Sequence, residues 1–105
     1  MYKVSFSPEA VDDLKEIKQY IKDELCNEQA AKNTVAKILK KVKLLSDFPE
    51  SSSSLSAIIG FDTDYRYLVC DNYIAFYRIE NKNVLIVRVL YGRRNYMQIL
   101  FGDIS

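Results

Sequence analysis

A run of strand-forming residues from Val84 to Tyr91 constrains the fold of this chain more than any other feature. Every position in the run except Arg88 favours β structure, and Gly92 ends it. A run this apolar indicates a central strand that is covered on both faces for much of its length. An unpartnered guanidinium is costly to bury in such a strand. Arg88 is therefore half of an ion pair, a residue at the rim of the sheet, or part of a charged site.

The residues before this run predict an antiparallel meander of three strands. Alternation with a period of two marks strands at 65–70 and 73–80, and the last strand covers 83–91. Asp71-Asn72 and Asn81-Lys82 are suited to two-residue turns. Such turns fix the pairing of the strands, because each extra loop residue would shift the register.

With two-residue turns, four pairs of residues face one another: Cys70 with Tyr73, Glu80 with Asn83, Arg66 with Tyr77, and Arg88 with Ala75. One face of the sheet then carries Arg66, Leu68, Tyr73, Ala75, Tyr77, Ile86 and Arg88. The opposite face carries Val69, Ile74, Phe76, Leu85, Val87 and Val89, and we expect helices to pack there because it is richer in aliphatic side chains.

The first half of the chain predicts a short strand at 2–6 and two helices, at about 8–25 and 28–46. Ser7 and Asn27 are suitable N-caps, and both helices carry a one-sided apolar stripe. The predicted fold is α+β, in the order β-α-α-β-β-β: an N-terminal strand and an antiparallel helix hairpin pack on one face of a mainly antiparallel sheet. We expect one domain, 1–105, with a mobile serine-rich loop at about 50–61.

Composition excludes several classes of function. No apolar run is long enough to cross a bilayer and no signal-peptide pattern is visible, so we expect a cytoplasmic protein with no membrane partner. The chain has no histidine, and Cys26 and Cys70 lack the spacing of metal ligands. We therefore predict no metal, no cofactor and two buried thiols.

The distribution of positive charge directs attention to the second half of the chain. The net charge is only +1, but all five arginines lie between Arg66 and Arg94. Guanidinium groups interleaved with tyrosines can pair phosphates and stack bases, although strand tyrosines are more often packing residues. The candidate binding residues are Arg66, Tyr77, Arg88, Arg93, Arg94 and Tyr96. The lysines of the second helix are interpreted as a solvated face.

A set of motifs runs in one order along nearly the whole chain. They are Ser7-Pro8-Glu9-Ala10, Asp13-Leu14-Lys15-Glu16-Ile17, Tyr20-Ile21, Leu44-Leu45 with Phe48-Pro49, Tyr65-Arg66-Tyr67-Leu68-Val69, Asn72-Tyr73-Ile74-Ala75-Phe76-Tyr77, and Val87-Arg88-Val89-Leu90-Tyr91-Gly92-Arg93-Arg94. Together they resemble the RelE/ParE superfamily of toxins. The resemblance implies the toxin half of a bacterial type II toxin–antitoxin module, of the kind used in plasmid stabilisation, which a cognate antitoxin neutralises.

The superfamily includes two mechanisms. ParE-like members block DNA gyrase without chemistry of their own, and the helix motifs and the ending from Arg88 to Arg94 are more ParE-like. We therefore expect a gyrase inhibitor whose target-binding residues are the six candidates above.

RelE-like members instead cut messenger RNA on the ribosome, and this alternative stays open. Arg94 falls where those nucleases place a catalytic arginine, and the resemblance would then assign catalysis to Arg66, Arg88, Arg94 and Tyr96. Ile74 replaces another arginine common in the nucleases, and Phe101 cannot act as an acid. A degenerate toxin that retains only antitoxin binding is the third possibility.

Overall fold

The computed structural model describes residues 1–102 and has the predicted α+β architecture. Its elements are β1 (Lys3–Phe6), α1 (Pro8–Glu24), α2 (Glu28–Lys43), the 3₁₀ turn η1 (Leu44–Ser46), β2 (Ser53–Ser54), α3 (Ser56–Ile59), β3 (Arg66–Cys70), β4 (Tyr73–Glu80), β5 (Asn83–Tyr91) and α4 (Tyr96–Phe101). The last three residues of the expected domain, 103–105, lie outside the described residues.

The strands form one sheet in the order β1-β5-β4-β3-β2. β1 pairs with β5 in parallel, and the other neighbours are antiparallel. The prediction that the run ending at Tyr91 is a central strand is confirmed, because β5 lies between β1 and β4. In the described part of the chain, no helix has the length and apolar character needed to cross a membrane.

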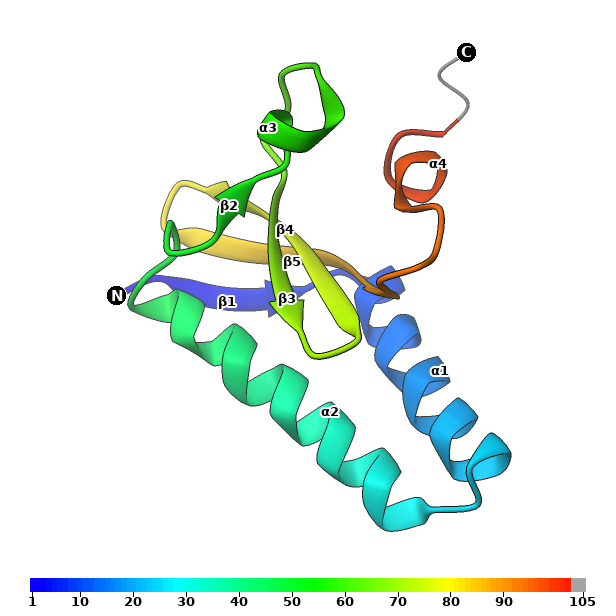
Figure 1. Ribbon diagram of the computed structural model, residues 1–105. Helices are drawn as coiled ribbons and strands as arrows, with labels where there is room; N and C mark the ends of the chain where they lie inside the picture. The colour runs from blue at the N-terminus through cyan, green and yellow to red at the C-terminus, as the bar shows by residue number, and fades with distance from the viewer. Residues whose placement is uncertain (103–105) are drawn as a thin grey trace.

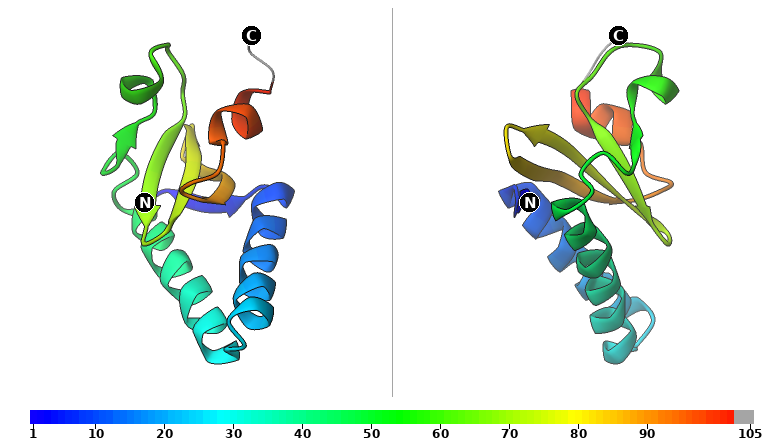
Figure 2. Two further views of the ribbon diagram at one scale, coloured as in Figure 1. Left: turned by 45° about the vertical axis from the view of Figure 1, so that its right-hand side comes forward. Right: turned by 90° about the vertical axis from the view of Figure 1, so that its left-hand side faces the viewer.

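Helices α1 and α2 form an antiparallel hairpin that covers one face of the sheet (Figure 1). Both predicted N-caps are confirmed: Ser7 Oγ accepts a hydrogen bond from Ala10 N at 3.0 Å, and Asn27 Oδ1 accepts one from Ala30 N at 2.9 Å. The helices lie close together at their connection and separate toward the sheet (Figure 2).

The face that packs against the hairpin, here called the helix-side face, is the opposite of the one predicted. It carries Leu68, Cys70, Tyr73, Ala75, Tyr77, Ile79, Val84, Ile86 and Val89. The other face, here called the outer face, carries Tyr67, Ile74, Phe76 and Leu90. The prediction assumed that the aliphatic face needs the long helices, but α3 and α4 cover that face instead (Figures 1 and 2).

Three of the four predicted cross-strand pairs are confirmed, and the fourth is wrong. Cys70 pairs with Tyr73, Glu80 with Asn83, and Arg66 with Tyr77. Arg88 lies opposite Phe76 instead of Ala75, because β5 has a bulge that leaves Val87 without a partner in β4. The bulge shifts every later residue of β5 by one position, so Val89 faces Ala75 on the helix-side face.

Three local features differ from expectation or were not expected. Helix α4 was not predicted. The segment expected as a loop at 50–61 contains β2 and α3, and Leu55 within it is fully buried. Cys70 is buried as expected, and burial raises the pKa of its thiol, but Cys26 is exposed in the hairpin connection.

Candidate functional site

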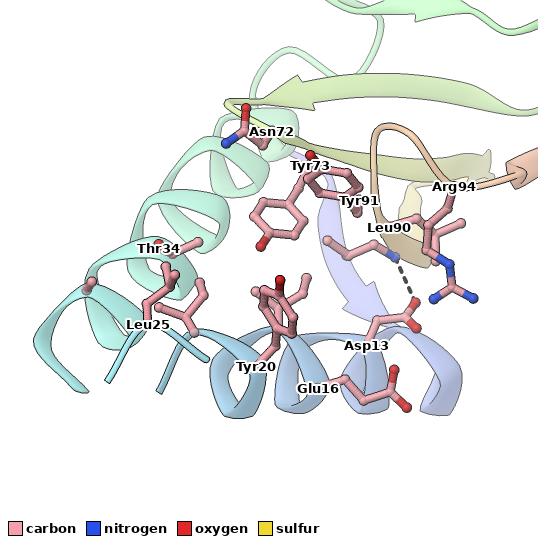
Figure 3. Close-up of a pocket in the computed structure, with 14 residues that line it drawn as sticks. Asp13, Glu16, Tyr20, Leu25, Thr34, Asn72, Tyr73, Leu90, Tyr91 and Arg94 are labelled. Atoms are coloured by element: carbon pink, nitrogen blue, oxygen red, sulfur yellow. Dashed lines mark hydrogen bonds between the residues drawn. The ribbon is translucent and has the colours of Figure 1, made fainter. Parts of the chain in front are cut away.

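A cleft of about 630 Å³ lies where the helix hairpin separates from the sheet (Figure 3). Its walls come from α1, α2, the β3–β4 turn and the end of β5 with the residues that follow. Its polar and aromatic lining residues include Asp13, Glu16, Tyr20, Tyr73, Tyr91 and Arg94. Arg94 lies at the same end of the cleft as Asp13 and Glu16 (Figure 3).

The tyrosines give this cleft an aromatic wall. The rings of Tyr73 and Tyr91 pack edge to face with their centroids 5.9 Å apart, and Tyr20 points toward Tyr73 from α1 (Figure 3). Burial raises the pKa of Tyr73 above its usual value, and Tyr20 and Tyr91 add to the shift. The Tyr73 phenol is therefore protonated at neutral pH and can donate a hydrogen bond, but it is not a base.

Asp13 and Arg88 form a bidentate ion pair between α1 and β5. Arg88 Nε lies 2.7 Å from Asp13 Oδ2, and Arg88 Nη2 lies 2.7 Å from Asp13 Oδ1. Val89 N also donates to Asp13 Oδ2, at 2.9 Å. The hydrogen bonds to Asp13 raise the pKa of Arg88, against the opposing effect of burial. Asp13 is only 4% exposed, and its three hydrogen bonds to Arg88 and Val89 hold the bulge of β5 against α1.

Arg66 and Tyr77 are also bonded within the chain, to the segment that follows η1. Arg66 Nη2 donates to the carbonyl oxygens of Glu50, at 3.2 Å, and Ser52. The Tyr77 hydroxyl donates to Pro49 O at 2.8 Å and contacts the Ser52 hydroxyl. Since Tyr77 is fully buried, these two side chains hold the segment after η1 against the sheet.

Arg93 and Arg94 follow β5 in an exposed turn. Gly92 N donates to Asn72 O at 2.8 Å, and Arg94 N donates to Tyr91 O at 2.9 Å. A Cβ at Gly92 would lie 3.3 Å from Asn72 O, so the close approach of the two turns favours glycine. Neither arginine forms an ion pair with any of residues 1–102.

Tyr96 begins α4, and its ring stacks on Phe76 with the centroids 5.1 Å apart. The ring therefore contributes to the small core of the outer face. Together with the Arg93–Arg94 turn, it marks the place where the chain leaves β5 and crosses to that face.

The structure divides the six residues that the sequence grouped. Arg66 and Tyr77 hold residues 49–52, Arg88 is paired with Asp13 beside the cleft that Arg94 lines, and Arg93, Arg94 and Tyr96 follow the end of β5. Arg66 and Arg88 lie on strands separated by β4, about 10 Å apart at the usual strand spacing. Their guanidinium groups also turn to different partners, so the three arginines of the nuclease alternative do not converge.

Sequence reasoning missed the cleft and the role of Asp13. The signal was present in the first helix, because Asp13 falls in the buried stripe between Ala10 and Ile17. An acidic residue in such a stripe needs a partner, and Arg88 needed one too. Among residues 1–102, no group of three or more potential ligands could hold a metal ion.

The chain is similar to known toxins in sequence and in fold. The family model described as "ParE toxin of type II toxin-antitoxin system, parDE" matches residues 4–96. The chromosomal ParDE toxin–antitoxin system from P. aeruginosa superposes with a TM-score of 0.74 at 20% identity, covering 87% of this chain and 96% of that chain. No curated protein sequence matches at a significant level.

Two further solved structures share the fold. The toxin–antitoxin complex RelBE2 from Mycobacterium tuberculosis gives a TM-score of 0.61 at 21% identity, covering 86% of this chain and 96% of that chain. YafQ from E. coli strain BL21(DE3) gives a TM-score of 0.51 at 18% identity, covering 97% of this chain and 100% of that chain. At these identities the likeness shows a shared fold, and it leaves the molecular target to be argued from the site.

Proposed function

Because the chain belongs to the ParE family of toxins of type II toxin–antitoxin systems, we propose that it arrests growth by binding DNA gyrase and that a cognate antitoxin neutralises it. In this proposal the toxin does no chemistry. The arginine turn after β5, Arg93 and Arg94, contacts the target, and Tyr96 supports that turn from the outer face.

The observation that carries this proposal is that two of the candidate arginines, Arg66 and Arg88, are already bonded within the chain. A nuclease that acts on messenger RNA needs guanidinium groups free to pair with the phosphate as it gains charge. Arg88 is instead paired with a buried carboxylate, and Arg66 is bonded to two backbone carbonyls. Releasing Arg88 would deprive the buried Asp13 carboxylate of two hydrogen bonds, and an unsatisfied buried polar group costs about 1–3 kcal/mol.

The lack of histidine and the setting of two tyrosines support the same proposal. The sequence has no histidine. The Tyr77 hydroxyl is buried and bonded to Pro49, and the pKa of Tyr73 is raised. A raised pKa makes Tyr73 a poorer base for a ribose 2′-hydroxyl, and the Tyr77 hydroxyl does not line the cleft.

The cleft between hairpin and sheet is the proposed docking site for the antitoxin. It combines apolar walls, including Ile17, Ile21 and Leu25, with the aromatic wall described above. Tyr20 and Leu25 are 60% and 63% exposed at its edge. An exposed apolar groove of this kind suits an amphipathic segment of a partner protein.

One observation favours the nuclease alternative. Arg94 is exposed, forms no ion pair within residues 1–102, and lines the cleft next to the end of β5. A single free arginine can stabilise a phosphate, so a ribosome-dependent endoribonuclease remains the second candidate.

The test is to purify the wild-type toxin with and without its antitoxin and to follow two readouts. The first is supercoiling of relaxed plasmid by purified gyrase, and the second is the mapping of messenger-RNA ends on translating ribosomes. We expect the free toxin to stop supercoiling, the antitoxin to restore it, and the messages to stay whole. Codon-phased cuts with normal supercoiling would establish the nuclease, and no effect in either assay would indicate a toxin reduced to antitoxin binding.

A further inference from the structure

The two helices of the hairpin differ sharply in charge. Helix α1 carries six acidic residues and three lysines, whereas α2 carries five lysines and one acidic residue. The α2 lysines are Lys32, Lys37, Lys40, Lys41 and Lys43, and all five are exposed. The net charge of +1 hides this separation, because the acidic helix offsets the basic one.

The lysines of α2 are not neutralised by the part of the chain that the structure describes. None of them forms an ion pair with any of residues 1–102. Lys37 has lysines three and four positions ahead, and such like-charged neighbours destabilise a helix by a few tenths of a kcal/mol each. The helix dipole favours the lysines of the last turn, but Lys32 and Lys37 lie before that turn.

Four of these side chains are free to meet a ligand. Lys41 donates to Val69 O at 2.5 Å and is held against β3. The others lie on the solvent side of the helix, away from the buried stripe of Ala31, Ile38 and Val42. From Lys32 to Lys43 the helix rises about 16 Å at its usual 1.5 Å per residue.

We propose that this face of α2 binds the phosphate backbone of duplex DNA through Lys32, Lys37, Lys40 and Lys43. Duplex DNA presents about one negative charge for every 1.7 Å of its axis, which matches an extended row of point charges. Lysine meets phosphate without a fixed geometry, so a convex helix surface without a pocket is sufficient. An acidic peptide would instead need apolar anchors seated in a pocket.

This inference rests on the proposed function, because a toxin bound to gyrase lies beside the duplex that gyrase handles. Contact between α2 and that duplex would add an electrostatic component to the association. It would also be independent of sequence, since backbone contacts carry no base information.

The experiment measures binding of the full-length toxin, purified free of antitoxin, to a fluorescent 20-base-pair duplex over a series of salt concentrations. Four phosphate contacts predict a slope of log K against log salt of about −3.6. The variant Lys37→Gln/Lys40→Gln should weaken binding and reduce the slope by about two. The matched control is Lys15→Gln/Lys18→Gln, which removes two exposed lysines with the same spacing from α1 and should leave the slope unchanged. Circular dichroism checks that both variants fold.

Three results would overturn the inference: no salt-dependent binding by the wild-type chain, an equal loss in the α1 control, or equally tight binding of polyglutamate or single-stranded RNA. Supercoiling assays on the same preparations separate this inference from the proposed function. Gyrase inhibition by a wild-type toxin that does not bind the duplex would refute DNA binding alone. Duplex binding without gyrase inhibition would support the α2 contact and refute the gyrase proposal.

Discussion

The helix-side face of the sheet carries a cluster of thirteen buried residues drawn from both helices and three strands, with Leu45 from η1. The cluster on the outer face has three buried residues, Leu55, Phe76 and Leu90, and otherwise consists of partly buried side chains. Hydrophobic stabilisation grows with the apolar area removed from water, so the two faces contribute unequally to folding. The helix-side face and the hairpin packed on it are here called the scaffold, and the outer face is the less strongly stabilised side of the molecule.

The exposed arginine turn lies at the boundary between these two regions. β5 is fixed to α1 by Asp13, and the chain then turns at Arg93 and Arg94 before α4 packs on the outer face. Segments with few buried contacts open more easily than a core does. The turn therefore has a rigid support on one side and a less strongly held helix on the other, and the following predictions test that contrast.

The largest expected effect is in the scaffold. Ile38 is 1% exposed on α2, and Ile38→Asp would bury an unpaired charge there, so we expect it to lower the free energy of unfolding by about 3 kcal/mol or more. Urea unfolding of the antitoxin-free chain measures the change. Leu39→Asp is the matched control, because Leu39 is 40% exposed and should tolerate the charge. Equal stability of the two variants would mean that the buried stripe is wrongly assigned.

A smaller loss is expected where the scaffold holds β5. Asp13→Ala leaves Arg88 and the Val89 amide without their partner. Removing one member of a buried pair costs about 3–5 kcal/mol, and we expect about 2–3 kcal/mol here because the Arg88 side chain is 24% exposed. The control is Asp12→Ala, at an exposed position of the same helix. If the two substitutions have equal effects in urea unfolding, the ion pair does not hold the bulge.

The outer face should tolerate truncation better. Phe101 packs edge to face against Phe61 and Tyr65, at centroid distances of 5.3 and 5.4 Å, but it is only partly buried. We expect Phe101→Ala to cost about 1 kcal/mol, compared with about 3 kcal/mol for Ile38→Ala in the scaffold. Thermal unfolding of the two variants gives the comparison. An equal or larger loss at Phe101 would contradict the unequal contribution of the two faces.

The elements that sequence predicted well are those specified by local chemistry. β4 and β5 begin and end where the alternation and the two-residue turns placed them, and both helices begin after their predicted caps. Asp71 and Asn81 have positive φ angles of 55° and 57°, which these residue types tolerate in tight turns. The register near both turns followed from those angles.

The elements that sequence did not predict depend on distant contacts. The bulge at Val87 lies next to Arg88, whose partner Asp13 is seventy-five residues earlier in the chain. The one extra residue of the bulge changes which side chains of β5 share a face of the sheet. The assignment of the two faces failed because α4, which covers the aliphatic side, has no strong local signal. The six candidate residues were wrongly grouped for the same reason. Arg66 and Arg88 bond to residues distant in the sequence, and no local pattern predicts those contacts.

The smallest expected effect on stability is at Arg94, and there the effect on function separates the two mechanisms. Arg94 is exposed and has no ion pair within residues 1–102, so Arg94→Ala should change the free energy of unfolding by less than about 0.5 kcal/mol. In a gyrase inhibitor the substitution removes one contact at the rim of an interface, where the loss is often under about 1 kcal/mol. Inhibition of supercoiling should then need less than about sixfold more toxin, since 1.4 kcal/mol is a tenfold change.

In a nuclease the same arginine would face a phosphate that gains charge in the transition state, and removing one such donor typically costs about 10²–10³ in rate. Messenger-RNA cleavage would then disappear while folding stayed intact. Arg93→Ala is the matched control, because Arg93 is the exposed neighbour in the same turn but does not line the cleft. We expect both variants to inhibit gyrase nearly as well as the wild type. A large loss of toxicity at Arg94 alone, together with loss of cleaved messages, would instead assign Arg94 to catalysis.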